Sequence, residues 1–147
     1  MIRCSLAALA ALFAVALLAA PAPAEAQAVP VRIRVIKGSR QGPAGVDPRL
    51  ESQKRQLSAL AYVKWDLVDE KSLELTQGKT QFLTLPGGDD VGVTLQERRG
   101  NTVTIEVALA ARNTQSRLTV EKGQRIVHQV APEKNGAAIF LTVLAWP

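Results

Sequence analysis

Cysteine, histidine and aromatic residues are scarce in this chain of 147 residues, which contains one cysteine, one histidine, two tryptophans, one tyrosine and three phenylalanines. The only cysteine, Cys4, lies in an N-terminal segment that we expect to be removed, so no disulfide would stabilise the remaining domain. A closed structural zinc site takes four cysteine or histidine ligands, which a single histidine cannot supply. We therefore expect a fold that depends on packing alone, with no metal and no cofactor.

Motifs for nucleotide binding and catalysis are also missing. The glycine-rich stretch from Gly38 to Gly45 lacks the Gly-Lys-Ser/Thr ending of a phosphate-binding loop and the glycine spacing of a dinucleotide-binding one. No Gly-x-Ser-x-Gly elbow presents a nucleophile, and His128 is expected on a strand face rather than in a catalytic triad. We therefore predict that the protein is not an enzyme. A hydrolase that pairs His128 with Asp66 or Asp69 stays an alternative.

The N-terminal 28 residues contain the one long apolar run that suggests targeting. Arg3 precedes a run of 15 small or apolar residues from Leu6 to Ala20, and a proline- and alanine-rich stretch follows it. This order is typical of a secretory signal peptide, whereas a membrane-spanning helix needs about 20 apolar residues. Small-x-small cleavage options follow Ala24, Ala26 or Ala28. We predict a cleaved signal over 1–28 and one periplasmic or secreted domain over 29–147, with no transmembrane span.

Positive charge exceeds negative charge, with 18 lysines and arginines, 13 acids and a formal net charge of +5 at pH 7. Part of the excess is concentrated in residues 31–50, where Asp47 is the only acid. Such a segment suits an envelope protein with an acidic surface or an anionic polymer, while its lack of interleaved aromatics argues against nucleic acid. The sequence leaves the oligomeric state open. The candidate partner-binding residues are Arg32, Arg34, Lys37 and Arg40.

Alternation of apolar and polar residues predicts a mainly β domain. Val31, Ile33 and Val35 would point to the opposite side from the residues between them, as in a half-buried strand. Similar runs recur every 8 to 12 residues or so, with turn-forming residues between them. They predict about seven to nine short strands in an antiparallel β-sandwich or a small barrel-like fold. The expected strands cover residues 31–37, 62–69, 72–77, 80–85, 91–97, 102–110, 116–120, 125–130 and 137–146.

Three further features organise these strands. Asp47 and Pro48 are typical of the start of a helix, and the apolar stripe after them predicts one helix over about 48–61, covering an end or an open edge of the sandwich. The Lys122-Gly123 turn predicts a hairpin between the strands on either side of it. The last strand, 137–146, is apolar on both faces, so we expect it to be central.

Three short sequence motifs follow one another along the chain. Asp47-Pro48-Arg49-Leu50 opens the expected helix, Tyr62-Val63-Lys64-Trp65-Asp66-Leu67 follows it, and Leu85-Pro86-Gly87-Gly88 lies among the strands. Together with the basic strand before them, they resemble a poorly characterised group of small exported bacterial proteins over about residues 31–146. The resemblance implies a β-rich envelope protein of unknown function and assigns no role to any residue.

These observations together predict a non-enzymatic exported binding domain of the cell envelope. It would contact its partner through the basic segment or through an unpaired strand edge, where a partner strand can be added. The alternative is a carbohydrate or envelope-polymer binding module whose exposed aromatic rings stack on sugars. Trp65 and Trp146 are the candidates for that stacking, since Phe82 and Phe140 are expected to fill the core.

Overall fold

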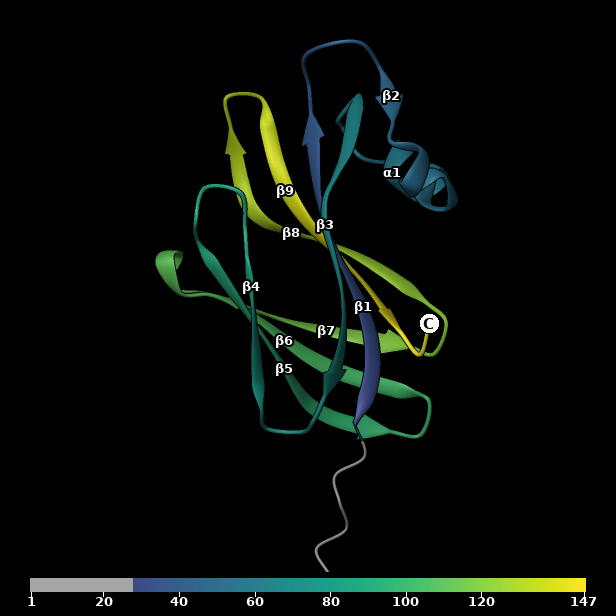
Figure 1. Cartoon of the computed structure of the whole chain (residues 1–147), viewed down its shortest axis with the longest axis vertical. Coiled ribbons are helices and arrows are strands. Elements are labelled where there is room, and N and C mark those ends of the chain that lie inside the picture. The colour runs from purple at the N-terminus through teal and green to yellow at the C-terminus, as the bar shows by residue number, and fades with distance from the viewer. Residues whose placement is uncertain (1–27) are drawn as a thin grey trace, which may run out of the picture.

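The computed structural model describes residues 28–147, which form two facing β-sheets, so a mainly β, sandwich-like fold is confirmed (Figure 1). The five-stranded sheet has the order β2-β3-β1-β9-β8, and the four-stranded sheet has the order β4-β5-β6-β7. The strands are β1 (Val29–Ser39), β2 (Gly45–Val46), β3 (Lys64–Leu75), β4 (Thr80–Thr84), β5 (Asp90–Arg99), β6 (Thr102–Leu109), β7 (Thr114–Glu121), β8 (Arg125–Lys134) and β9 (Ala137–Ala145). The helical segments are η1 (Pro48–Gln53), α1 (Lys54–Ser58) and η2 (Ala110–Arg112). Apart from Ala28, the predicted signal lies outside the described residues.

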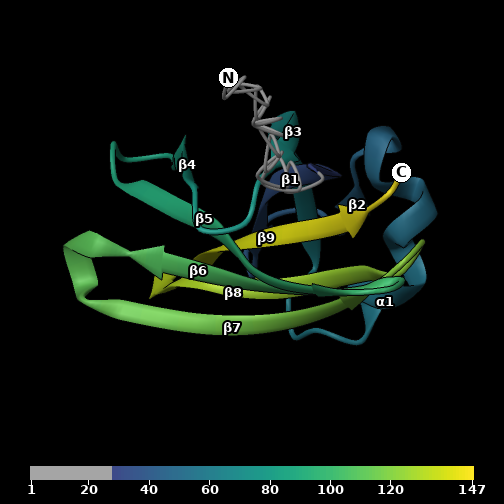
Figure 2. The same ribbon diagram turned by 90° about the horizontal axis from the view of Figure 1, so that it is seen from below.

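The two sheets are assembled differently along the chain. The four-stranded sheet is a meander in which each strand pairs with the next in an antiparallel manner. The five-stranded sheet instead brings both ends of the described chain together, because β1 pairs with β3 on one side and with β9 on the other (Figure 2). β9 lies inside the sheet between β1 and β8, as expected of a strand that is apolar on both faces, and is buried along most of its length.

One predicted break in the strand order is absent. The charged residues Asp69, Glu70 and Lys71 were expected to separate two short strands, but β3 runs through them without interruption. They pair with Ile33 to Val35 of β1, and Glu70 meets the guanidinium group of Arg34 there. A complementary charge on the neighbouring strand therefore lets an acidic segment stay extended.

The predicted hairpin around Lys122 and Gly123 is also wrong. The turn is present, but β7 belongs to the four-stranded sheet and β8 to the five-stranded sheet. The amide of Lys122 donates to the carbonyl of Asn101, and the amide of Gly123 donates to the carbonyl of Ala145, so the turn is bonded to both sheets. Turn residues indicate a reversal of the chain but do not reveal whether the strands that follow pair with each other.

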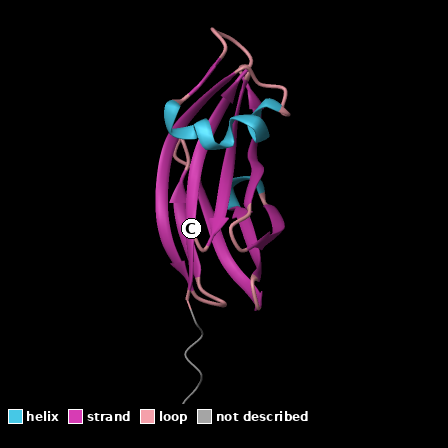
Figure 3. Cartoon of the chain, turned by 90° about the vertical axis from the view of Figure 1, so that its right-hand side faces the viewer, coloured by secondary structure: helices cyan, strands magenta, loops and turns pink. Residues whose placement is uncertain are grey.

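The helical segment is shorter than predicted and lies elsewhere. It consists of η1 and α1 and ends at Ser58, and it crosses the outer face of the five-stranded sheet rather than an end or an edge (Figure 3). Leu50 and Leu57 bury their side chains there against residues of β1, β3 and β9. An apolar patch on the outer face therefore determines where the segment lies.

Side chains on the two faces of β1 contribute to two different hydrophobic cores. Val31, Ile33 and Val35 face the four-stranded sheet, within a core whose buried members are all aliphatic. Ile36 faces the other way, into a smaller outer core beneath the helical segment, as the alternation predicts. The buried members of this outer core are Ile36, Leu50, Leu57, Trp65, Ala138 and Phe140.

Candidate functional site

The four basic residues predicted to bind a partner lie in different parts of the structure. Arg32 and Arg34 lie midway along β1, on the outer face of the sheet. Lys37 is exposed further along the strand, and Arg40 lies in the loop that follows it. The four candidate residues therefore do not form one continuous surface.

Arg40 serves as a structural clamp. Its Nε donates to both carboxylate oxygens of Glu133, at 2.7 and 2.8 Å, and its Nη1 donates to the carbonyl of Ala61 at 3.1 Å. The guanidinium carbon lies 4.8 Å from the centre of the Tyr62 ring, whose hydroxyl donates to Glu133 at 3.2 Å. The hydrogen bonds and charge of Glu133 raise the pKa of Arg40. These contacts tie the loop after β1 to β8.

Three arginines gather on the outer face of the five-stranded sheet. Arg32 of β1 and Arg125 of β8 both lie opposite Leu144 of β9, and Arg34 follows two residues along β1. Glu70 accepts from Arg34 Nε, and its other oxygen lies 4.0 Å from Arg32 Nε. Burial, followed by the positive charges of Arg34 and Arg32, lowers the pKa of Arg125. Arg125 was not among the residues predicted from the sequence, because only the pairing of β8 with β9 brings it here.

The helical segment borders this arginine cluster, defined as Arg32, Arg34 and Arg125. Arg34 Nη1 donates to Gln53 Oε1 at 3.2 Å, and Arg125 Nη1 donates to Ser52 Oγ at 3.2 Å. The Gln53 side chain is only 2% exposed, yet its Nε2 has no acceptor, and neither has the buried Nε of Arg32. Donors without acceptors therefore lie beside an excess of positive charge.

Asp47 caps the start of the helical segment, as predicted. One carboxylate oxygen accepts from the amide of Arg49 at 3.0 Å, and the other accepts from Arg49 Nη2 at 2.7 Å and from the amide of Leu67 at 3.3 Å. The hydrogen bonds from Arg49 hold the pKa of Asp47 well below its usual range. The carboxylate therefore anchors the segment to β3.

Neither tryptophan lies open on the surface. Trp65 is 2% exposed and packs edge-on against Tyr62 and Phe140 in the outer core, with ring centres 5.7 and 5.2 Å away. Trp146 is half-buried against the inner core, the aliphatic core between the two sheets. The guanidinium carbon of Arg98 lies 5.3 Å from its ring centre. Burial removes Trp65 as a residue that stacks on sugars, and Arg98 already occupies a stacking position on Trp146.

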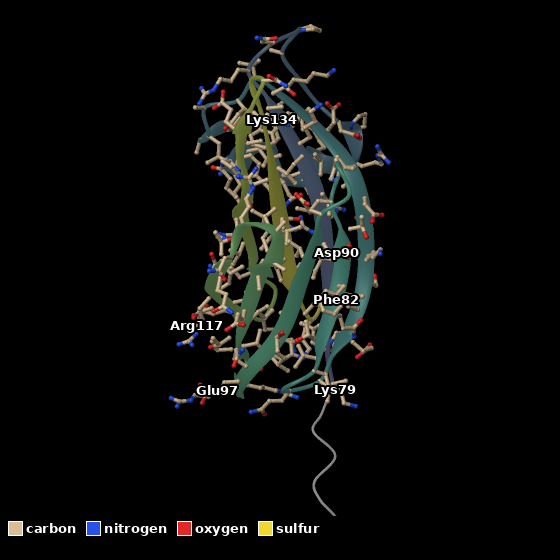
Figure 4. The ribbon with its side chains drawn as sticks, turned by 90° about the vertical axis from the view of Figure 1, so that its left-hand side faces the viewer. Lys79, Phe82, Asp90, Glu97, Arg117 and Lys134 are labelled. Atoms are coloured by element: carbon tan, nitrogen blue, oxygen red, sulfur yellow. The ribbon has the colours of Figure 1, made fainter. Side chains whose placement is uncertain are left out.

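Phe82 contradicts the expectation that it fills the core, since it is 66% exposed on β4 (Figure 4). Its partner across the ladder is Gly92 of β5, where a Cβ would meet the Phe82 ring at 3.4 Å. An aromatic ring over a strand glycine shields the backbone that the glycine leaves uncovered. Leu83 takes the core position on β4 instead, whereas Phe140 is buried in the outer core.

A groove of about 530 Å³ opens between β7 and β8. These two strands belong to different sheets and diverge from the turn that joins them (Figure 1). The apolar side chains that line the groove include Val107 and Leu109 from β6 and Val130 from β8. The polar residues along it are Arg112, Thr114, Ser116, His128 and Gln129. None of the lining residues is acidic.

His128 lies in this groove, on the side of β8 that faces the four-stranded sheet. Burial lowers its pKa, which favours the neutral imidazole. Asp66 and Asp69 lie on β3, and two strands separate β3 from β8, so the structure does not assemble the pair suggested for a hydrolase. Ser116 lines the same groove, but within residues 28–147 no hydrogen bond joins it to His128.

The two strand edges beside the groove differ. β7 pairs with β6 in an unbroken register over eight residues and contains no proline. The register of β8 with β9 shifts twice, and Pro132 lies in the strand. Bulges and proline protect an edge from further pairing, so β7 is the edge that is open to an added strand.

Within residues 28–147, no cluster of three or more histidine, cysteine, aspartate or glutamate side chains is placed to hold a metal ion. No helix in that part of the chain is long and apolar enough to cross a bilayer. No known protein family matches the chain, and no curated protein or solved structure matches it either. The resemblance to small exported envelope proteins stays a prediction.

Proposed function

We propose that the protein is a non-enzymatic, exported binding domain of the cell envelope that receives an extended strand of a partner protein in the groove between β7 and β8. The proposal rests above all on one observation, which is that the regular free edge of β7 runs beside an apolar groove. A free edge supplies the main-chain hydrogen bonds of strand addition, and a groove beside it selects side chains. Neither role requires a catalytic group.

The groove suits an added strand in which apolar and polar residues alternate. Successive side chains of a strand point to opposite sides, so every second residue of an added strand would face the groove. Val107, Leu109 and Val130 would receive apolar side chains there. The residues between them would face solvent and can be polar.

Charge favours an acidic partner over a second copy of this chain. Arg112 lines the groove without a carboxylate among the lining residues, and the whole chain carries a formal net charge of +5. A carboxylate near Arg112 would be attracted, whereas two copies of a basic chain repel each other over the same distance. The occupant is therefore an extended segment, apolar at alternate positions, that carries at least one acid.

Selection from a library of random peptides displayed on phage tests this directly, with the purified protein as the target. We expect enriched peptides to alternate apolar residues and to contain an acid. The affinity of synthetic versions is then measured by fluorescence anisotropy. Ser116→Glu places a carboxylate in the groove and should weaken binding by about tenfold or more. Amides of β7 should gain protection from hydrogen exchange when the peptide binds.

Thr119→Glu is the matched control, because Thr119 lies on the same strand but on the opposite side from Ser116. It introduces the same charge outside the groove and should leave the affinity unchanged. Equal binding to both variants, or peptides without alternation, would overturn the proposal. A dimer in sedimentation experiments that Ser116→Glu dissociates would do so as well, because a second copy would then be the occupant.

A further inference from the structure

The arginine cluster has more positive charge than its surroundings balance. Arg32, Arg34 and Arg125 face one carboxylate, that of Glu70, which bonds Arg34 and lies 4.0 Å from Arg32. The nearby Arg49 is already paired with Asp47 at 2.7 Å. The three arginines therefore carry two more positive charges than the one carboxylate that pairs with them.

Unused hydrogen-bond donors lie at the same place. The Nε of Arg32 and the Nε2 of Gln53 are both buried and have no acceptor. Gln53 is joined to the cluster through its own oxygen, which accepts from Arg34, so its amide nitrogen lies beside that guanidinium group. Buried donors normally have partners, so these two donors are available to an acceptor group that binds beside them.

We propose that the arginine cluster is a binding site for a phosphoryl group, separate from the groove between β7 and β8. A phosphate monoester carries a charge of about −1.5 to −2 at neutral pH and offers three acceptor oxygens. That charge balances the two positive charges by which the three arginines exceed Glu70, which a single carboxylate would not do. Arginine presents its donors in a planar fork that fits phosphate oxygens.

The cluster is built so that such a group can enter. Arg32 and Arg125 lie on either side of Leu144, with β9 between their strands. The Arg32 side chain is 39% exposed, so the site is open to solvent. Ser52 and Gln53 of η1 hold Arg125 and Arg34 from the other side. The guanidinium groups are thus held in place before a ligand arrives, which lowers the entropic cost of binding.

Titration with inorganic phosphate tests the site, followed through the Nε–Hε resonances of the arginine side chains by nuclear magnetic resonance. We expect the signals of Arg32, Arg34 and Arg125 to shift together and to saturate. Arg125→Gln should weaken binding by at least about fivefold, since it removes one charge and a fork of donors. Arg55→Gln is the matched control, because Arg55 is an exposed arginine of α1 outside the cluster.

Glu70→Gln gives a result in the opposite direction. The carboxylate of Glu70 competes with a phosphoryl group for the same donors, so its removal should strengthen phosphate binding severalfold. A purely structural Glu70 would produce no such gain. Circular dichroism and thermal unfolding of each variant show whether it remains folded. If Arg125→Gln unfolds, Glu70→Gln and the arginine resonances of the unaltered protein still decide the outcome.

Vesicles distinguish the source of the phosphoryl group. Binding to inorganic phosphate assigns the site to free or accessible phosphoryl groups. Binding only to vesicles that contain phosphatidic acid, a lipid phosphate monoester, and not to phosphatidylcholine alone, assigns it to a lipid headgroup. No arginine shift with either probe, or an equal effect of Arg125→Gln and Arg55→Gln, would overturn the proposal. Loss of peptide binding in the groove would leave this result unaffected, because the two sites lie on different faces.

Discussion

The two faces of the five-stranded sheet follow different rules of packing. Eighteen buried residues, all aliphatic, fill the inner face and the sheet opposite to it. Six buried residues make up the outer core, and two of them, Trp65 and Phe140, are aromatic. A full sheet covers the inner face, whereas a short helical segment covers only part of the outer face and leaves the arginine cluster beside it open. One face thus maintains the fold, and the other combines packing with a surface that can bind.

The largest expected effect comes from the inner face. Leu141 lies fully buried on the interior strand β9, and Leu141→Ala should lower the free energy of unfolding by about 3–5 kcal/mol. Urea unfolding measures this loss, and hydrogen exchange should become faster in both sheets. Leu141→Met keeps most of the volume and should cost less than about 1.5 kcal/mol. If the loss were confined to the helical segment, the two cores would not differ as described.

A substitution in the outer core should destabilise mainly the helical segment that covers it. Leu57→Ala removes a buried side chain from α1 and should cost about 2–3 kcal/mol, because a surface segment can partly close the cavity. Hydrogen exchange should accelerate in the helical segment while the inner strands keep their protection. Arg55→Ala, two residues away and exposed, should change little. Loss of protection throughout both sheets would show that the outer core is needed for the whole fold.

Gly38 tests how tightly the aromatic cluster packs. A Cβ at this position would lie 2.9 Å from Cζ3 of Trp65 and 3.0 Å from Cγ of Tyr62, so Gly38→Ala should displace the rings and cost about 1–3 kcal/mol. Tryptophan fluorescence should shift at the same time. Gly45→Ala is the control, since nothing lies within 4 Å of a Cβ there. Equal stability of both variants would mean that the cluster is loosely packed.

The smallest expected effect concerns the attachment of the helical segment through Asp47. The folded state holds the pKa of Asp47 below its ordinary value, so the carboxylate stabilises the fold above about pH 4. This stabilisation is lost as the pH falls toward the lower folded pKa, because the unfolded state binds the proton first. Thermal unfolding should therefore separate wild type from Asp47→Asn most clearly near neutral pH and less in acid.

Arg49 provides the second arm of this test, since its hydrogen bonds are the main cause of the lowered pKa of Asp47. Arg49→Gln should reduce the dependence of stability on pH in the acid range. An unchanged acid profile in both Asp47→Asn and Arg49→Gln would show that the cap does not stabilise the attachment of the segment to the outer face.

Much of the strand pattern was predictable, because alternation is a local property. The expected strands around 80–85, 102–110 and 137–146 lie within one or two residues of β4, β6 and β9. The continuity of β3 was not predictable from local sequence, since the charges that suggested a turn are balanced by Arg34 on another strand. Phe82 was assigned to the core because it is large and apolar, but the alternation of β4 turns Leu83 inward and leaves Phe82 exposed over Gly92.

The candidate site was less predictable for the same reason. Arg32 and Arg34 were predicted from the sequence as binding residues, but the residues beside them were not. Arg125 of β8 lies next to them, whereas Arg40 is bound to Glu133 instead. The signal that the sequence did contain was the even spacing of Arg32 and Arg34, which places both on one strand face. No pattern within one segment could indicate the groove, which strands of the two sheets form together.

The sequence by itself determined that the domain is mainly β, where most strands run, that Asp47 starts a helical segment and that the last strand lies inside a sheet. These properties follow from side-chain alternation, capping chemistry and local hydrophobicity. Only the tertiary structure decided which strands pair, which face the helical segment covers, and how the groove and the arginine cluster are assembled. Pairing between distant strands depends on contacts across the whole chain, and sites made by such pairing have no local signature.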